Sequence, residues 1–87
     1  METKLLFDGF IDILDKRVGI KIYKEEDEGH ITFSFSQSHY LQDKNDMMPY
    51  HPGSGGIDGT LEGLLNKING YKQRFHKVVK TEDNPDF

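Results

Sequence analysis

A glycine-rich run precedes a segment with helical periodicity, and such an arrangement can bind an anion. Backbone N–H groups and the positive end of the helix dipole can hold a phosphate or carboxylate at a helix start. The run lacks the lysine of a P-loop, and Asp58 stands where the dinucleotide fingerprint needs glycine. We expect a hinge and a helix cap, and keep a small-anion or nucleotide site as an alternative. Its residues would be Gly53, Ser54, Gly55, Gly56, Gly59 and Thr60.

Histidines and carboxylates raise the question of metal binding or acid–base catalysis. The candidate metal ligands are His39, Asp43, Asp46 and His51. No helical or turn spacing fixes these side chains relative to one another. Asp8 and Asp12 lie four residues apart on one strand, about 13 Å by strand rise, which is wide for a pair of catalytic carboxylates. We therefore expect no metal site, no cofactor and no enzyme activity.

Three stretches alternate apolar and polar residues with the period of two that is typical of half-buried strands. They cover residues 7–14, 17–24 and 30–36. The short connections predict a three-stranded antiparallel β-meander. A two-residue turn at Asp15 and Lys16 would place the aliphatic residues of the first two strands on one face of the sheet.

The C-terminal third has the periodicity of an amphipathic helix, which we predict over about residues 60–80. Its apolar positions, projected at 100° per residue, fall within an arc of roughly 140°. They are Leu61, Leu64, Leu65, Ile68, Tyr71, Phe75, Val78 and Val79. Asp58 or Thr60 is a suitable N-cap. Asn69 and Gly70 leave an alternative open, in which the helix is shorter and residues 71–79 form a fourth strand.

The remaining segments are a long loop, residues 37–59, and a C-terminal tail, residues 81–87. The loop is rich in aromatic and apolar residues, so we expect its first half to be at least partly ordered. We expect the tail to be flexible. The fold prediction is therefore a single α+β domain over residues 1–80, in which one helix packs on the meander.

Length and composition limit the functional classes. The chain has 87 residues, enough for one domain with a small core, and no cysteine, which fits a reducing compartment. No apolar run is long enough to span a membrane, and the first residues do not resemble a signal peptide. We expect a cytoplasmic protein, in a bacterial host if it is phage-encoded, as a monomer or homodimer without membrane contact.

Charge is unevenly distributed along the chain. Residues 1–58 carry eleven acidic and six basic residues, whereas residues 59–87 carry four acidic and five basic ones. The net charge of −4 disfavours general attraction to nucleic acid, so direct nucleic-acid binding is not expected. The acidic side could instead engage a basic groove on a protein. Its residues are Asp8, Asp12, Glu25, Glu26, Asp27 and Glu28.

The side of the predicted helix opposite its apolar arc carries two glycines, Gly63 and Gly70, among basic residues. Glycine inside a helix costs about 1 kcal/mol relative to alanine. Close approach of a partner would justify this cost, and simple tolerance of the glycines would explain it equally well. The basic residues assigned to this surface are Lys67, Arg74 and Lys77.

Aromatic and methionine residues that the core cannot absorb indicate a protein contact. Phe10 and Tyr23 are expected on the outer face of the sheet, with Phe10 beside Lys21 and Tyr23 opposite Asp8. The loop adds Met47, Met48 and Tyr50. The alternative is a satellite cluster packed under the loop.

One segment resembles a protein family. Tyr50-His51-Pro52, a glycine and aspartate stretch, and Glu62-Gly63-Leu64 are similar to the Tyr-Tyr-Pro to Glu-Gly-Ile segment of the immunity proteins that inhibit DNase colicins. The likeness covers less than a third of the chain. Because that family is an all-helical bundle and residues 7–36 here have strand periodicity, we interpret the likeness as convergence.

The sequence favours a non-catalytic protein-binding module that inhibits a larger protein or a nucleic-acid-processing complex. A toxin inhibitor and a phage anti-defence protein of the anti-CRISPR type are the kinds of molecule expected. The alternatives are the anion or nucleotide module and a homo-oligomeric structural protein that associates through the outer face of the helix.

Overall fold

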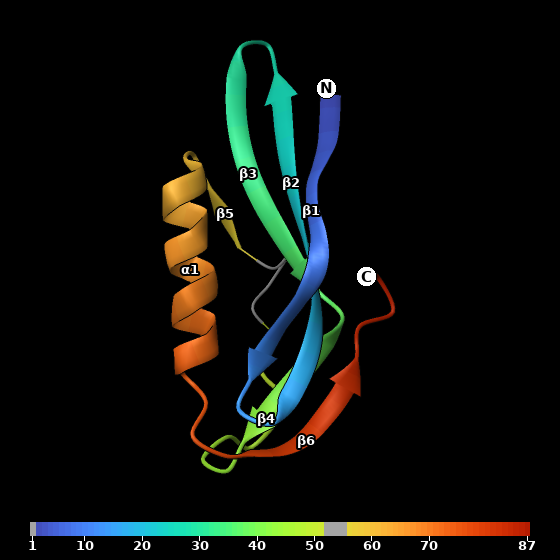
Figure 1. Cartoon of the computed structure of the whole chain (residues 1–87), viewed down its shortest axis with the longest axis vertical. Coiled ribbons are helices and arrows are strands. Elements are labelled where there is room, and N and C mark those ends of the chain that lie inside the picture. The colour runs from blue at the N-terminus through green and yellow to red at the C-terminus, as the bar shows by residue number, and fades with distance from the viewer. Residues whose placement is uncertain (1, 52–55) are drawn as a thin grey trace.

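The computed structural model describes residues 2–51 and 56–87, in which one helix packs on an antiparallel sheet (Figure 1). The elements are β1 (Glu2–Ile13), β2 (Lys16–Asp27), β3 (His30–Gln37), β4 (His39–Asp43), β5 (Ile57–Asp58), α1 (Leu61–Gln73) and β6 (Val78–Asp83). The α+β class, the antiparallel sheet and the C-terminal helix are confirmed. The strand number is wrong, because the described residues contain six strands and not three.

The sheet has the strand order β1-β2-β3-β5, and β4 and β6 form a separate two-stranded sheet. β1 and β2 are 12 residues long, and each extends beyond the predicted strand. Within the part of the chain that the structure describes, β1 pairs with β2 alone and is therefore an edge strand. Its pairing is interrupted by an irregularity between Leu5 and Phe7.

The β1–β2 turn lies at Leu14 and Asp15, one residue earlier than predicted. Ile11 therefore pairs with Val18 and Ile13 with Lys16. Leu14 has a positive φ of 57°. A leucine rarely adopts this conformation, so the residue type does not indicate a turn at this position. The two-residue shift in register preserves the faces of the strands, since side chains alternate with a period of two.

The predicted loop, residues 37–59, contains two strands and a bridge. β4 begins directly after Ser38, whose backbone N–H donates to the Gly19 oxygen at 2.8 Å. Tyr50 forms an isolated bridge with Leu41. The first half of this segment is thus ordered as expected, and its description as a loop is wrong for β4 and β5.

The helix is shorter than predicted, since α1 ends at Gln73 and a strand follows. Phe75 is buried although it lies outside the helix. The carboxylate of Asp43 accepts hydrogen bonds from the backbone N–H groups of His76 and Lys77, each at 2.7 Å. These bonds fix the chain in a turn, so the apolar residues that seemed to continue the helix belong to the turn and to β6.

Residues 81–87, expected to be a flexible tail, have a defined placement. Residues 81–83 complete β6, and the backbone N–H of Asn84 donates to the Ser38 oxygen at 2.9 Å. The Phe87 ring lies over Gly19 and under the ammonium of Lys21, which is 4.3 Å from its centroid. The C-terminus therefore covers part of the outer face of β2.

Two groups of buried side chains form the core. One joins α1 to the middle of the sheet, and its members are Ile20, Ile22, Phe35, Leu64 and Ile68. The other lies where β4 meets the β1–β2 turn, and its members are Ile13, Val18, Leu41, Tyr71 and Phe75. Ile11 packs against both groups. Leu61 and Leu65 remain exposed, so the buried stripe of α1 is narrower than the predicted arc.

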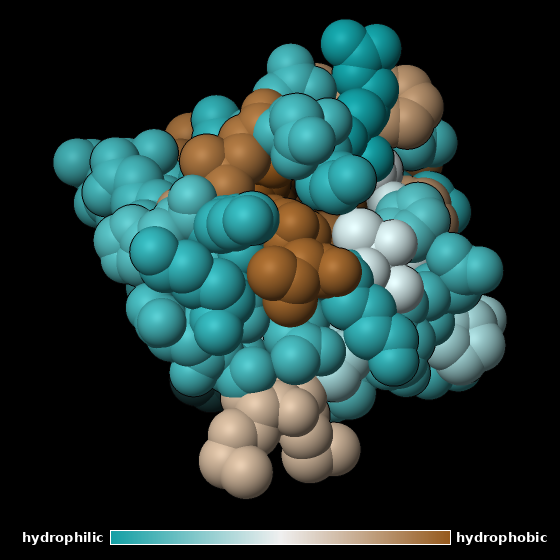
Figure 2. Space-filling model, turned by 90° about the horizontal axis from the view of Figure 1, so that it is seen from below, coloured by the Kyte–Doolittle hydropathy of each residue, from teal (hydrophilic) through white to brown (hydrophobic). Residues whose placement is uncertain are grey.

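The molecule is elongated, with extents of 43 × 23 × 21 Å, and its two ends differ. We call the β2–β3 turn with residues 2–8 and 23–34 the hairpin end; no residue in these two ranges is buried. It extends beyond α1 in Figure 1. We call β4, β6 and residues 74–77 the base. Figure 2 shows the lower end of the molecule, where apolar side chains gather among hydrophilic ones.

No helix in the described part of the chain is long and apolar enough to cross a membrane.

Candidate functional site

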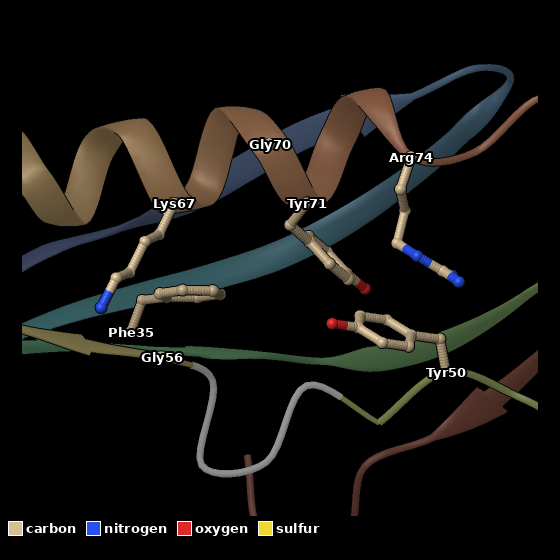
Figure 3. A pocket seen from close by; sticks show the side chains of 7 residues that line it. All are labelled: Phe35, Tyr50, Gly56, Lys67, Gly70, Tyr71 and Arg74. Carbon is tan, nitrogen blue, oxygen red and sulfur yellow. The ribbon is translucent and has the colours of Figure 1, made fainter.

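An open pocket lies beside α1, on the β3–β5 side of the sheet (Figure 3). Its volume is about 460 Å³, which is in the range of small-molecule sites. The lining residues are Phe35, Tyr50, Gly56, Lys67, Gly70, Tyr71 and Arg74. Four of them, Tyr50, Lys67, Gly70 and Arg74, were assigned to partner binding from the sequence, and Gly56 was assigned to the anion site. The fold brings these five positions together.

Three aromatic rings form the apolar walls. The ring centroid of Tyr71 lies 6.3 Å from that of Phe35 and 6.0 Å from that of Tyr50, which is nearly parallel to it. The backbone N–H of Tyr50 donates to the Leu41 oxygen at 2.8 Å. Gly56 has a φ of 105°, and a Cβ there would overlap the Phe35 ring, so only glycine lets the chain approach this wall.

The hydroxyl of Tyr71 is buried and has no hydrogen-bond partner within residues 2–51 and 56–87. Its side chain is among the most buried of the pocket, with 5% of the residue exposed. Burial raises the pKa of Tyr71 to about 12, so the hydroxyl keeps its proton at neutral pH. Figure 3 shows the Tyr50 and Tyr71 side chains reaching into the pocket from opposite sides, with their rings beside one another. A buried hydroxyl donor is therefore present at the inner wall.

Arg74 is held at one end of the pocket by an acid and an aromatic ring. Its two terminal nitrogens each donate to a different carboxylate oxygen of Asp46 at 3.1 Å. The guanidinium carbon lies 3.8 Å from the Tyr50 ring centroid. The hydrogen bond from Arg74 lowers the pKa of Asp46, and the same contact raises the pKa of Arg74. This pair also stabilises the end of α1 against the base.

Lys67 lies at the other end of the pocket. Its ammonium donates to the Ile57 oxygen and lies 3.5 Å from the Asp58 carboxylate. Asp58 also accepts from the backbone N–H of Thr60 at 2.9 Å, and this bond is the main cause of its lowered pKa. β5 and the start of α1 thus position the ammonium.

The helix N-terminus is occupied by groups of the protein itself. The Thr60 hydroxyl accepts from the backbone N–H of Gly63 at 3.0 Å, as an N-cap does. The carboxylate of Asp58 lies over the same turn. Gly59 and Thr60 therefore do not present a free anion site, and Gly56 belongs to the pocket. Gly53, Ser54 and Gly55 lie outside the described residues.

The two helix glycines have different surroundings. A Cβ at Gly63 would overlap the Asp58 carboxylate, so the first turn of α1 requires this glycine. A Cβ at Gly70 would meet nothing within 4 Å. The expectation that both glycines form one open contact surface is therefore wrong, and Gly70 alone remains open.

The cross-strand pairs on the outer face of the sheet differ from the predicted pairs because the register is shifted. Tyr23 lies opposite Leu5, and Asp8 lies opposite Lys21, so the predicted pairing of Tyr23 with Asp8 is wrong. Phe10 is the most exposed aromatic residue of β1, at 67%. Four apolar side chains of β1 are exposed in total: Leu5, Leu6, Phe7 and Phe10.

The remaining acidic candidates occupy two places. Asp12 lies beside Phe10 on β1 and pairs with the Arg17 Nε at 3.3 Å. The acidic run belongs to the hairpin end: Glu25, Glu26 and Asp27 end β2, and Glu28 is in the turn. Figure 1 shows this turn at the end of the sheet that extends beyond α1, and none of the four residues lines the pocket.

The last candidates lie near the base. Met47 and Met48 are exposed, and Met47 is 97% accessible. Lys77 lies between α1 and β6, so its predicted place on the helix is wrong. These residues do not line the pocket.

The suggested metal ligands have other partners. Asp43 accepts the backbone N–H groups of His76 and Lys77, and the bond from Lys77 is the main cause of its lowered pKa. His39 lies 3.1 Å from Asp83. Residues 2–51 and 56–87 contain no group of three or more His, Cys, Asp or Glu side chains that could hold a metal ion.

Phe35, Tyr71 and the acids that hold the two cations were not predicted as site residues. The strand and helix periodicities place Phe35 and Tyr71 in the core, and Asp46 and Asp58 were considered only as a metal ligand and as a helix cap. A signal was present on the helix. Lys67, Gly70, Tyr71 and Arg74 have the i, i+3, i+4, i+7 spacing of one helix stripe.

Comparisons with protein-family models, with curated proteins and with solved structures found no match to this chain.

Proposed function

We propose that the protein is a non-catalytic binding module that adds a strand of a partner protein to the free edge of β1. The observation that carries this proposal is a 12-residue edge strand whose exposed apolar side chains lie next to an unpaired backbone. In strand addition, main-chain hydrogen bonds supply affinity and the alternating side chains supply specificity. The partner is therefore expected to bind as an extended segment.

The edge supports this proposal through both backbone and side chains. Along an edge strand, alternate residues direct their N–H and C=O groups away from the sheet, where another strand can pair with them. Leu5 is 49% exposed and Phe7 is 46% exposed. Burial of such side chains stabilises association in proportion to the apolar area removed from water.

The irregularity between Leu5 and Phe7 restricts which strand can pair. A β-bulge changes which residues share a face and increases the local twist, and natural edge strands use bulges to prevent indiscriminate pairing. A partner must match two short regular stretches on either side of Leu6. This requirement favours one cognate segment over general sheet growth.

Charge indicates a basic partner. Residues 2–8 and 21–30, which include the hairpin end's turn, carry six carboxylates and three lysines. A complementary potential raises the rate of association. The partner segment is thus expected to alternate apolar residues with lysine or arginine. Inhibition of a nucleic-acid-processing complex, as by an anti-CRISPR protein or a toxin inhibitor, is one activity that such a module can have.

Peptide display tests the strand addition. A library of extended peptides is selected on the immobilised wild-type protein, and selected peptides are then measured with Leu5→Lys/Phe10→Lys. The matched control is Leu61→Lys/Leu65→Lys, which removes two exposed leucines from α1. We expect the β1 variant to lose binding at least tenfold and the helix variant to retain it. Hydrogen exchange should show new protection in β1.

Three results would contradict the proposal. Equal peptide binding by the two double variants would exclude β1 as the site. New hydrogen-exchange protection that appears only in other elements would also exclude β1 as the site. A dimer mass that disappears only in the β1 variant would assign the edge to a second copy of this chain.

The electrostatic part has its own test with the selected peptide. Glu26→Lys/Asp27→Lys is expected to slow association and to reduce its dependence on salt, because the carboxylates that attract a basic strand are reversed. Stopped-flow measurements at several salt concentrations would show this. An unchanged association rate would remove the role of the acidic run while leaving strand addition intact.

A further inference from the structure

The pocket beside α1 is not used by the proposed strand addition. It lies on the β3–β5 side of the sheet, whereas β1 forms the opposite edge. Its contacts therefore need a separate explanation.

The walls select for a flat, apolar ring. Phe35 and Tyr71 are almost fully buried, and Tyr50 is held by its backbone bond to β4. Aromatic rings pack favourably on one another with centroids about 4.5–7 Å apart. The spacing of Tyr71 from its two neighbours falls in this range, so the three rings pack on one another and form one apolar wall.

The charges of the lining have one sign. Among the described residues, the lining contains the cations Lys67 and Arg74 and no carboxylate. Asp46 and Asp58 hold these cations without forming part of the lining. A guanidinium has five N–H donors and an ammonium has three, so both groups retain donors beyond those used by their acids.

The tyrosine hydroxyls add neutral donors between the cations. The Tyr71 hydroxyl is buried and has no hydrogen-bond partner among the described residues, which costs stability because a buried donor is left unsatisfied. An anionic oxygen that reached the inner wall would accept from it and remove this cost.

Gly70 leaves access along the helix. A Cβ there would meet no atom of the described residues within 4 Å, and Gly70 lines the pocket. Close approach of a ligand to the backbone would account for a glycine in the middle of α1.

We propose that this pocket binds a small planar aromatic molecule that carries one anionic group, a carboxylate or a phosphate. The ring lies against Phe35 and the two tyrosines. The anionic oxygens accept from Lys67 and from the tyrosine hydroxyls.

The test is an NMR titration of the folded, full-length chain with three probes. Indole-3-acetate carries a carboxylate, adenosine 5′-monophosphate carries a phosphate, and indole-3-acetamide is the neutral control. We expect saturable shifts of the Lys67, Gly70 and Arg74 amides with one of the two anions. The neutral control should bind about tenfold more weakly, because hydrogen bonds to charged groups are the stronger ones. The tighter anion identifies the charged group.

Two variants locate the site. Gly70→Leu should abolish binding by filling the entrance, whereas Asn66→Leu adds the same side chain at an exposed position of α1 outside the lining and should bind normally. Lys67→Met should weaken the anion about tenfold and leave indole-3-acetamide unchanged.

The proposal fails if neither anion gives saturable shifts, if the amide binds as tightly as the acid, or if Gly70→Leu binds as wild type. The Leu5→Lys/Phe10→Lys variant should bind the anion normally, so the two proposals can fail independently.

Discussion

The two ends of the molecule are built from the same sheet but are stabilised differently. At the base, side chains join segments that are distant in sequence: Asp46 pairs with Arg74, and Asp43 accepts the N–H groups of His76 and Lys77. At the hairpin end, strand pairing holds residues 23–34, and none of them is buried. Contacts between distant segments therefore stabilise the base, whereas the hairpin end depends on strand pairing.

Acidic residues have different roles at the two ends of the molecule. The turn of the hairpin end uses Glu28 and Gly29, both with positive φ, as type I′ turns require. The neighbouring acids Glu26 and Asp27 are exposed. At the base, Asp43 is buried and accepts backbone donors, and the half-buried Asp46 next to it accepts from the Arg74 guanidinium. The same residue type thus stabilises structure in one region and sets surface charge in the other.

The largest expected difference between the ends is in the cost of removing a leucine. Leu41 is fully buried at the base, and Leu5 is exposed at the hairpin end. Leu41→Ala should lower the free energy of unfolding by about 2–5 kcal/mol, because it leaves a cavity. Leu5→Ala should change it by about 0.5 kcal/mol or less. Chemical denaturation followed by circular dichroism measures both; similar losses would refute the contrast.

Low pH should destabilise the base of the molecule in particular. The backbone N–H of Lys77 holds the pKa of Asp43 below its ordinary value of 3.8, and Arg74 does the same for Asp46. Since the folded pKa values are lower than the unfolded ones, this stabilisation is complete above the ordinary value and is lost as the pH falls through the folded values.

Asp43→Asn tests this dependence. The variant should be less stable at neutral pH, and its melting temperature should decline less steeply below pH 4, since one of the groups that must be protonated is absent. Melting curves from pH 2 to pH 7 measure the slope. Leu5→Ala is the control, because it removes no titratable group and should keep the wild-type slope. An unchanged slope in Asp43→Asn would contradict the proposed linkage.

The sequence was sufficient for elements that depend on local pattern. The Thr60 cap and the stripe of Leu64, Ile68 and Tyr71 place the helix start and its buried face. Strand alternation places Ile20, Ile22 and Phe35 on one face. These features follow from the periods of 3.6 and 2, which need no knowledge of distant segments.

The parts that failed depend on contacts between distant residues. The end of α1 is set by Asp43, more than 30 residues earlier in the chain, and β6 exists because β4 pairs with it. In the candidate site, Lys67 and Arg74 were predicted because of their charge, and Gly70 because a glycine inside a helix is unfavourable. Their meeting with Phe35 and Tyr50 requires the tertiary fold and has no local signal.

The two glycines of α1 show a smaller contrast of the same kind, between a position in contact with other residues and an exposed one. Gly63 lies against Asp58, whereas Gly70 faces open space. Gly70→Ala should raise the free energy of unfolding by about 0.5–1 kcal/mol, because alanine has the higher helix propensity and its Cβ meets no atom. Gly63→Ala should gain less or be destabilising, because its Cβ displaces the Asp58 carboxylate from Thr60. Denaturation of the two variants under one condition gives the difference, and equal gains would show that the Asp58 contact at Gly63 contributes nothing to stability.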